Sequence, residues 1–350
     1  MKIRVFNPEH DLALAANLAN FTSPHAGRQL RADLGFIPAL WAEADDVVLV
    51  GDSDEAERKY RMLVKQPFGR FVTKDCLRAL HATGVDVWGW DLAIRAFLLR
   101  HGVDSRLLPS DDQIAQIREL SHRRYAAEVL SRLQGDGIIG EATMITSYEA
   151  FLEQLARAGR FVVKAPWSSS GRGVRFIDGS LNKSDDGWLR RVIATQGAVM
   201  VEPHYNKVKD FGMEFMSDGQ GRVVYLGLSL FQTSGSAYTG NVLATEEDKL
   251  EIISRYLSVD LLIDVQQKIM AITGALYLDK YAGPFGVDMM VVAREDREGF
   301  WLHPCVEINL RRTMGHVAIN LTRHLPTLPK LMTIICDNFS YKLIFLKDYL

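Results

Sequence analysis

Two acidic segments near the end of the chain have the residue types of a metal site. Asp288 lies within 286–290, and Glu307 and Asn309 lie two residues apart in a second strand-like segment, so those two share a face. The polar segment 294–299 between them predicts a hairpin turn, and the midpoint of positions 288 and 307 falls inside it. Asp288 should therefore face Glu307 on a paired strand. Two carboxylates and an amide suit Mg²⁺ bound to nucleotide phosphates. The alternative is an exposed pair of acids on a sheet surface.

A Ser/Gly-rich loop follows Lys164. Residues 164–174 are KAPWSSSGRGV, so one strand delivers the lysine and a second strand begins at Val174. The backbone N–H groups and hydroxyls of such a loop can surround phosphate oxygens, while the lysine adds a point charge. The segment lacks the Gly-Lys-Ser/Thr ending of a P-loop, and no helix follows its glycines. An ordinary hairpin turn explains the segment equally well.

A third segment, 198–205, is an apolar strand that ends in Glu202-Pro203-His204. Such a strand is typical of a link between two subdomains, where backbone groups and one carboxylate can bind the edge of an adenine ring. Taken alone, Glu202 is more often a solvated residue at the end of a strand.

Strand-like and helix-like segments alternate over residues 1–105, with strands at 3–6, 46–50 and 86–88. This alternation predicts parallel βαβ units, whose ligands bind at the carboxyl ends of the strands. The polar loop 7–11 follows the first strand. A boundary is predicted near Pro109, followed by helices at 111–120, 121–133 and 147–158. Strands dominate from 161 to 308, interrupted by helices at 245–256 and 261–276, and the region from His316 is predicted to be helical.

Composition excludes several classes of protein. The chain has 350 residues, which suggests about two domains, and 41 Lys and Arg against 43 Asp and Glu give a net charge of −2. A broad nucleic-acid-binding surface normally needs a basic excess, so no nucleic-acid partner is expected. Apolar runs are far shorter than a membrane span, and the N-terminal segment lacks the features of a secretory signal. Three scattered cysteines form neither a disulfide framework nor a zinc motif, so a cytoplasmic location is predicted.

In chain order, these motifs resemble the ATP-grasp superfamily over about residues 110–320. Lys164 with its loop comes first, Glu202 second and Asp288 third, and the E-x-N-x-R segment 307–311 is the most specific part. The resemblance implies an α/β (α+β) fold class, in which an ATP-grasp domain at 109–350 follows a small parallel α/β domain at 1–108. Within the ATP-grasp domain, a central lobe at 109–202 would carry the phosphate loop. A C-terminal lobe at 203–350 would carry the metal site.

The resemblance also implies a role for individual residues. Lys164 would contact ATP phosphate beneath the loop 168–173, and Arg123 would be a second cation where the family usually has lysine, with Arg124 as the alternative. On the continuing strand, Arg311 would share the face of Glu307 and Asn309 and stabilise the transferring phosphoryl group. The loop residues Ser168, Ser169, Ser170, Gly171 and Gly173 would also contact phosphate. Adenine would be bound by Glu202, the His204 backbone and Met290, and ribose by Asp210. Mg²⁺, with Mn²⁺ as an alternative, would be bound by Asp288, Glu307 and Asn309.

The implied activity is an ATP-dependent ligase that joins a small carboxylate to an amine or thiol through an acyl phosphate. Two alternatives remain open, a kinase that phosphorylates a hydroxyl and a nucleotide-binding module without turnover. The substrates and the oligomeric state are left open, with a homodimer as one option. The acceptor site is expected to involve the segment 231–236 and residues Asn7, Glu9, His10, Arg312 and His316. For each of these, a structural role in capping, packing or surface pairing is the alternative.

Overall fold

The computed structural model describes residues 1–157, 159–168, 173–234, 237–325 and 330–346. It divides into two compact units. Unit 1 comprises Met1–Glu119, Thr239–Asp248 and Leu310–Leu350, and unit 2 comprises Leu120–Tyr238 and Lys249–Asn309. The mixed α/β class predicted from the sequence is confirmed, with one parallel sheet and further antiparallel sheets. Each unit is built from segments that are separated in the sequence, because the C-terminal segment belongs to unit 1. The division at 108/109 remains a prediction.

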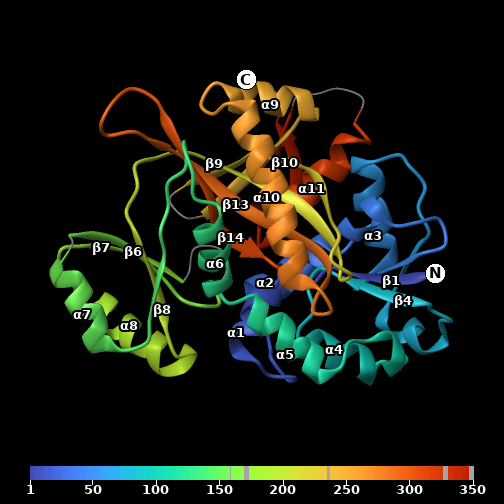
Figure 1. The fold of residues 1–350 in the computed structure, drawn as a ribbon. Coiled ribbons are helices and arrows are strands. Elements are labelled where there is room, and N and C mark those ends of the chain that lie inside the picture. The colour runs from blue at the N-terminus through green and yellow to red at the C-terminus, as the bar shows by residue number, and fades with distance from the viewer. Residues whose placement is uncertain (158, 169–172, 235–236, 326–329, 347–350) are drawn as a thin grey trace. The chain divides into compact units, whose positions relative to one another are not determined.

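A parallel sheet forms the centre of the N-terminal part of unit 1. Its order is β3-β2-β1-β4, and its apolar strands are largely buried, as expected for a parallel sheet covered by helices. Side chains of Asp52 and Asp91 accept from backbone N–H groups and so cap α3 and α4. The elements are β1 (Lys2–Val5), α1 (His10–Ala16), α2 (His25–Leu34), β2 (Val47–Leu49), α3 (Ser53–Leu63), β3 (Arg70–Val72), β4 (Gly84–Val87), α4 (Leu92–Arg100) and α5 (Asp111–Leu120), with short 3₁₀ helices at Ile37–Trp41, Lys74–Ala79 and Ser105–Leu107 (Figure 1).

The C-terminal part of unit 1 corrects the sequence prediction. Helix α11 (Met314–Thr322) ends early, and an antiparallel hairpin of β15 (Lys330–Asp337) and β16 (Ser340–Leu346) follows where a helix was predicted. Both turn residues, Asn338 and Phe339, have positive φ angles of 48° and 64°. This is the conformation of a two-residue hairpin turn. β12 (Ala237–Leu243) pairs with β15 through residues 241–243.

Asp33 fastens this hairpin to α2. Its carboxylate accepts from the backbone N–H of Tyr341 at 2.7 Å and from Gln29 at 2.9 Å, and Lys59 Nζ lies 3.2 Å away. Burial raises the pKa of the Asp33 carboxyl, but these hydrogen bonds outweigh burial and leave the pKa below its usual value. The charged form therefore stabilises the fold.

We expect Asp33→Asn to lower the free energy of unfolding by about 2 kcal/mol at pH 7, because the partners lose a charged acceptor. A depressed pKa adds stability above about pH 4, the ordinary carboxyl pKa, and this stability is lost as the pH falls through the folded-state value. The difference between wild type and variant should thus narrow below about pH 4 in urea titrations. A constant difference down to acid pH would contradict the assignment. The exposed Asp75 offers a control, Asp75→Asn.

The first sheet of unit 2 has the order β5-β8-β6-β7. Its strands are β5 (Thr143–Ile145), β6 (Arg160–Lys164), β7 (Val174–Asp178) and β8 (Val199–Pro203), and the helices are α7 (Tyr148–Arg157) and α8 (Lys183–Gln196). Phe161, Val163 and Val201 belong to a core that includes residues of α7 and α8. Because strand residues alternate, Lys164 and Glu202 lie on the opposite face of this sheet.

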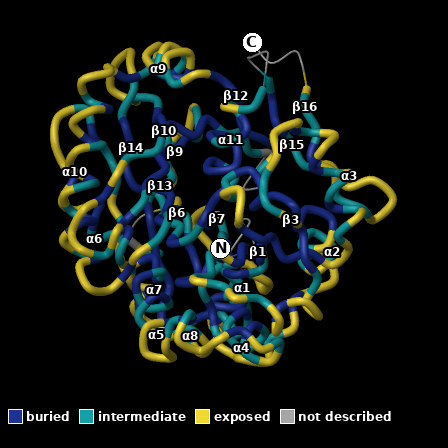
Figure 2. Tube along the Cα trace, turned by 90° about the vertical axis from the view of Figure 1, so that its right-hand side faces the viewer, coloured by how far each residue is buried: buried dark blue, intermediate teal, exposed yellow. Residues whose placement is uncertain are grey.

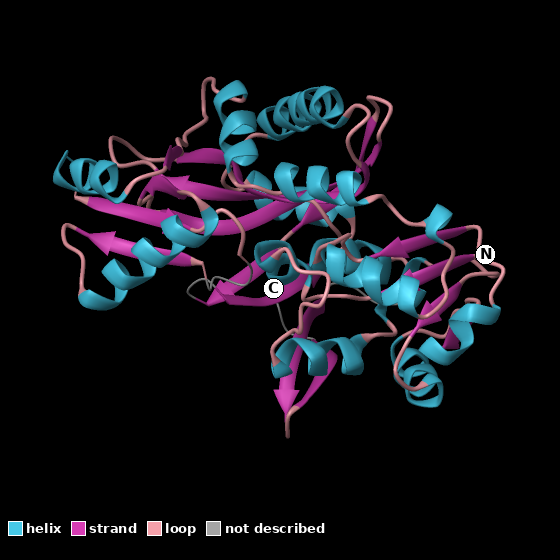
Figure 3. Cartoon of the chain, turned by 90° about the horizontal axis from the view of Figure 1, so that it is seen from below, coloured by secondary structure: helices cyan, strands magenta, loops and turns pink. Residues whose placement is uncertain are grey.

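The second sheet of unit 2 has the order β10-β9-β13-β14, and α10 covers one face of it (Figure 1). Phe215 and Phe285 stack in its core at 5.2 Å between ring centroids. Figure 2 shows these strands largely buried and α9 and α10 with exposed outer positions, and Figure 3 distinguishes helices from strands by colour. The elements are α6 (Arg124–Arg132), β9 (Lys207–Asp218), β10 (Val223–Ser229), β11 (Phe231–Ser234), α9 (Glu246–Ser254), α10 (Val259–Tyr277), β13 (Ala282–Ala293) and β14 (Phe300–Asn309). Within the described ranges, no helix combines the length and apolar character needed to cross a bilayer.

Candidate nucleotide and metal site

The predicted facing acids are brought together on β13 and β14. Asp288 is the register partner of Glu307, and Gly286 is the partner of Asn309. Asn309 Nδ2 donates to Asp288 Oδ2 at 3.0 Å. The prediction that Asp288 and Glu307 face each other on paired strands is thus confirmed. Among the residues that the structure describes, no group of three or more His, Cys, Asp or Glu forms a metal cluster, so this candidate set consists of two acids and one amide.

An irregularity in β14 sets this register. The turn is closed by the Arg294 N–H, which donates to the Gly299 carbonyl, and regular pairing runs up to Met290 opposite His303. The pairing then shifts, so that four steps along β14 match two along β13. This stretch contains Pro304, which has no N–H to donate to a ladder. Without the shift, the partner of Asp288 would be Cys305 instead of Glu307.

Arg123 neutralises Glu307. Its guanidinium lies 2.6 Å from Glu307 Oε1 and 2.7 Å from Ser168 Oγ, and it also donates to the carbonyl of Ala165. Arg123 is buried, whereas Arg124 is exposed and lies over the ring of Tyr125. An adjacent cation relieves the repulsion between two facing carboxylates. Of the two arginines, Arg123 is therefore the one that joins the acidic pair to the start of the Ser/Gly-rich loop.

The two ends of the loop meet as an antiparallel pair. Lys164 is the register partner of Val174, and the Ala165 N–H donates to the Gly173 carbonyl at 2.8 Å. A Cβ on Gly173 would lie 2.2 Å from the Ser168 side chain, so only glycine fits there. The predicted contacts Ser169, Ser170 and Gly171 lie outside the described residues.

Lys164 and Glu202 form a buried ion pair. Their Nζ and Oε2 atoms are 2.6 Å apart, and each side chain is 8% exposed. Lys164 Nζ also lies 3.3 Å from the Val306 carbonyl on β14. Glu202 is therefore not a solvated strand end. At His204, the backbone N–H donates to the Arg160 carbonyl, so only its carbonyl remains for an adenine contact.

Asp210 and Met290, predicted at ribose and adenine, are register partners on β9 and β13. Met290 is two residues beyond Asp288 and so shares its face. Asp210 Oδ2 accepts from Lys207 Nζ at 2.5 Å and from Thr233 Oγ1 at 2.6 Å. The structure therefore places Met290 and Asp210 beside the acidic pair on one sheet face, whereas Glu202 lies on the other sheet of unit 2.

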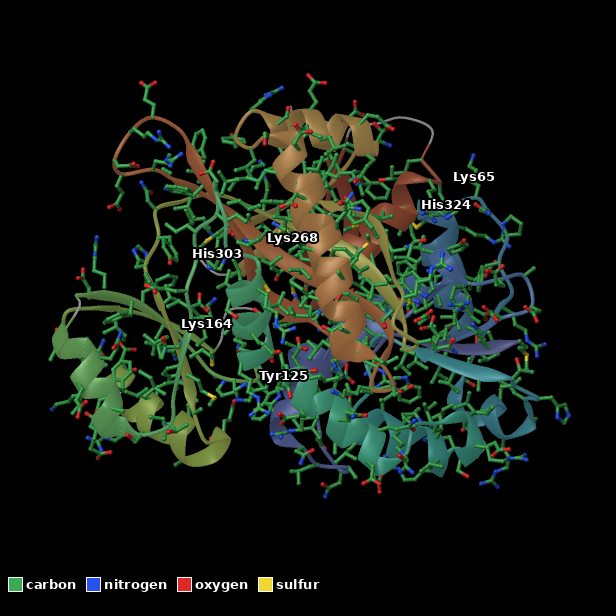
Figure 4. The ribbon with its side chains drawn as sticks, in the orientation of Figure 1. Lys65, Tyr125, Lys164, Lys268, His303 and His324 are labelled. Atoms are coloured by element: carbon green, nitrogen blue, oxygen red, sulfur yellow. The ribbon has the colours of Figure 1, made fainter. Side chains whose placement is uncertain are left out.

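His303 is a site-face residue that the sequence prediction missed. It is the register partner of Met290, its exposure is 0%, and neither ring nitrogen has a hydrogen-bond partner among the described residues. Burial, followed by the nearby Lys164 cation, lowers the pKa of His303 to about 3, so the ring is neutral at pH 7. Lys164 and His303 are labelled in Figure 4. The sequence contained one signal for His303: it lies four residues before Glu307, and every second residue of a strand shares a face.

The prediction that the strand continues to Arg311 is wrong. β14 ends at Asn309, and the Arg312 N–H donates instead to the Trp88 carbonyl in unit 1. Arg311 forms two hydrogen bonds with the Asp11 carboxylate, at 2.9 and 2.7 Å. Arg311 is therefore not on the strand face of Glu307 and Asn309, and strand geometry does not support its predicted role at the transferring phosphoryl group. Its proposed role rests on the resemblance alone.

Arg312 is buried in a network instead of lying at a solvated strand end. Its guanidinium is 2.9 Å from Asp86 Oδ2 and lies 4.4 Å over the Trp41 ring. Arg4 donates to the same Asp86. We expect Arg312→Ala to destabilise the protein by about 3 kcal/mol, because it removes one member of a buried charge network. Thermal unfolding compared with the exposed-site variant Arg61→Ala tests this, and equal melting temperatures would contradict it.

Other residues predicted at the acceptor site have structural partners in unit 1. Asn7 donates to the Gly89 carbonyl at 2.8 Å, and His10 Nδ1 lies 3.2 Å from Asp91. His316 completes a capping box at the start of α11, which matches the capping alternative. Glu9 makes no side-chain cap to α1. Of the predicted segment 231–236, residues 235 and 236 lie outside the described residues.

The likeness of this chain to known proteins lies in its structure. No protein-family model matches the sequence, and no curated protein matches it. Among solved structures, an N5-carboxyaminoimidazole synthetase from Staphylococcus aureus complexed with ADP matches at a TM-score of 0.50 and 13% identity, over 95% of this chain and 82% of that one. A biotin carboxylase–β-γ-ATP complex from Campylobacter jejuni matches at 0.52 and 13% identity, over 97% of this chain and 77% of that one. At this identity the likeness shows a shared fold, which agrees with the ATP-grasp fold that the motifs of this chain predict.

Proposed function

We propose that the protein is an ATP- and Mg²⁺-dependent ligase that joins a carboxylate to an amine or thiol. The main support is a cluster of side chains in unit 2. Asp288, Glu307 and Asn309 lie together on β13 and β14, and Arg123 links Glu307 to Ser168. The ADP- and ATP-bound states of the two similar structures support ATP as the nucleotide. At this similarity they establish the fold, so the activity rests on the site.

The donor set fits a magnesium ion. Asp288 and Glu307 supply carboxylate oxygens and Asn309 supplies an amide oxygen, which are the ligand types that Mg²⁺ prefers, and Asn309 Nδ2 donates to Asp288 Oδ2. When bound there, Mg²⁺ (or Mn²⁺) would neutralise charge on the β- and γ-phosphates. These three residues would hold the ion.

The other residues of the site would position ATP. Lys164 and Arg123 would bind phosphate oxygens, with Ser168 and Gly173 at the two ends of the covering loop. Glu202 would accept from the adenine amino group, Met290 would pack on the ring and Asp210 would hold the ribose. His204 would contribute its backbone carbonyl.

The proposed reaction has two steps. An oxygen of the substrate carboxylate attacks the γ-phosphorus, the bond to ADP breaks and an acyl phosphate forms. The amine or thiol then attacks the acyl carbon and displaces inorganic phosphate, and the nucleophile loses a proton. The chain contributes positioning and stabilisation of the migrating charge, as in phosphoryl transfer generally.

We expect Arg311→Ala to lower kcat on the order of 10²-fold or more while ATP affinity changes little, because a cation on the migrating phosphoryl group acts mainly in the transition state. The competing explanation is that Arg311 only anchors α1 through Asp11. Asp11→Asn separates the two, since it weakens the anchor but keeps the arginine. If Asp11→Asn reproduces the whole loss in steady-state kinetics, Arg311 is structural.

An ADP-release screen with Mg²⁺ over amino acids, small peptides and polyamines tests the proposed function. We expect ADP release to depend on an acceptor, and hydroxylamine to trap the acyl phosphate as a hydroxamate. Phosphate retained on a substrate hydroxyl, with no hydroxamate, would contradict ligation and identify a kinase. ATP binding without any release would indicate a module without turnover.

A further inference from the structure

Unit 1 contains a pocket of its own, of about 230 Å³, at the carboxyl ends of β1 and β4. In the sheet order β3-β2-β1-β4, the chain runs from β1 to one side to form β2 and β3 and then crosses to the other side for β4. A crevice between β1 and β4 is therefore the topological switch point, where open α/β sheets bind ligands. Asn7 and Asp91, which follow these strands, line the pocket.

Glu9 gives this pocket an unused acceptor. Its Oε1 atom lies 2.9 Å from Arg31, and its Oε2 atom is buried with no hydrogen-bond partner in the described part of the chain. The side chain is only 12% exposed. A buried carboxylate oxygen without a donor is costly, and a ligand N–H would remove that cost.

The opposite charge lies at the pocket rim. Arg100 on α4 lines the pocket, is exposed, and has no ion pair among the described residues. Arg31 is already held by Glu9 and lies 5.3 Å over the Phe97 ring. Phe97, Phe21 and Ile94 supply apolar lining. Within the described ranges, the pocket thus combines an unpartnered carboxylate oxygen, an arginine without an ion pair and an apolar wall.

We propose that this pocket binds a small α-amino acid with an apolar side chain. Its ammonium group donates to Glu9 Oε2, its carboxylate pairs with Arg100, and its side chain packs against Phe97. An amino acid carries both an amine and a carboxylate, so it is of the class that the ligase reaction requires. This identification as a substrate rests on the proposed function, whereas the binding itself does not.

Calorimetry on the full chain without ATP tests the pocket with L-leucine, L-leucinamide and 4-methylpentanoate. The amide lacks the carboxylate and the acid lacks the amine, so each should bind at least about tenfold more weakly than leucine, as expected for one lost charged contact. Glu9→Gln and Arg100→Gln should each weaken leucine binding by a similar factor while ATP affinity is unchanged. The exposed ion pair of α3 offers matched controls, Glu57→Gln and Arg61→Gln, which should bind leucine normally.

The proposal is overturned if L-alanine, L-valine, L-leucine and L-phenylalanine all fail to bind to protein that still binds ATP. It is also overturned if 4-methylpentanoate binds as tightly as leucine, or if the Glu9 and Arg100 variants behave like the controls. Such failures leave the ATP site untouched. Conversely, amino-acid binding in the pocket, with no ADP release in the whole screen of paired carboxylates and amines, would support the pocket and contradict the ligase function.

Discussion

Asp288→Asn and Glu307→Gln are each expected to lower acceptor-dependent ADP release on the order of 10²-fold while the protein remains folded. Each substitution removes one negative charge from the oxygen set that would hold Mg²⁺, and it keeps the size of the side chain. Because the two carboxylates face each other, Asp288→Asn also removes like-charge repulsion, so the apo protein should not lose stability from it.

The control for this pair is Glu298→Gln, an exposed acid in the turn that joins the same two strands. It should retain full turnover. Glu307→Gln also removes the partner of Arg123, so its melting temperature must be measured alongside its activity. Turnover within about threefold of wild type in both site variants would refute the metal assignment.

Lys164→Met is expected to lower both stability and ATP affinity, through separable causes. Removing the ammonium leaves the Glu202 carboxylate buried without its cation, which costs about 3–5 kcal/mol in comparable pairs. It also removes a charged phosphate contact, worth about 1.5–3 kcal/mol, or roughly ten- to a hundredfold in affinity. Melting temperature and calorimetry with an ATP analogue measure the two effects.

The double variant Lys164→Met/Glu202→Gln separates them, because it no longer buries an unpaired charge. We expect it to regain most of the lost melting temperature and none of the lost ATP affinity. Lys268→Met, on α10, is the surface control, since Lys268 is 44% exposed and labelled in Figure 4. Full recovery of ATP affinity in the double variant would show that Lys164 acts only through stability.

The sequence predicted the facing acids because alternation along a strand and the position of a polar turn are both local properties. It could not predict the register shift at Pro304, and counting outward from the turn alone leaves Cys305 as an equally good partner for Asp288. The midpoint of positions 288 and 307 lies inside the turn 294–299, but so does the midpoint of 288 and 305. The turn position alone therefore does not distinguish the two registers.

The sequence prediction failed where the chain leaves a local pattern. The sequence pattern predicts that the strand continues past Asn309, yet the Arg312 N–H donates to the carbonyl of Trp88, a residue remote in sequence. The apolar C-terminal segment predicts a helix, although β-branched residues such as Thr333 and Ile334 favour strands. The turn at Asn338 and Phe339 lacks the usual glycine, which removed the strongest hairpin signal.

The buried Lys164–Glu202 pair shows a different limit. Residue types and order identified both residues, but their mutual distance depends on the pairing of β6 with β8, which spans 38 residues of sequence. The same holds for Arg123, whose contact with Glu307 spans 184 residues. Composition and periodicity carry no information about such contacts.

We propose that unit 2 binds ATP through a cation held by Asp288, Glu307 and Asn309. This binding is tested by calorimetry of a non-hydrolysable ATP analogue, with Mg²⁺ and with EDTA, on wild type and on the Asp288→Asn/Glu307→Gln double variant. We expect wild type to bind at least about tenfold more tightly with Mg²⁺, and the double variant to show no such dependence. Equal affinity of wild type with Mg²⁺ and with EDTA, or an undiminished Mg²⁺ effect in the double variant, would contradict the claim.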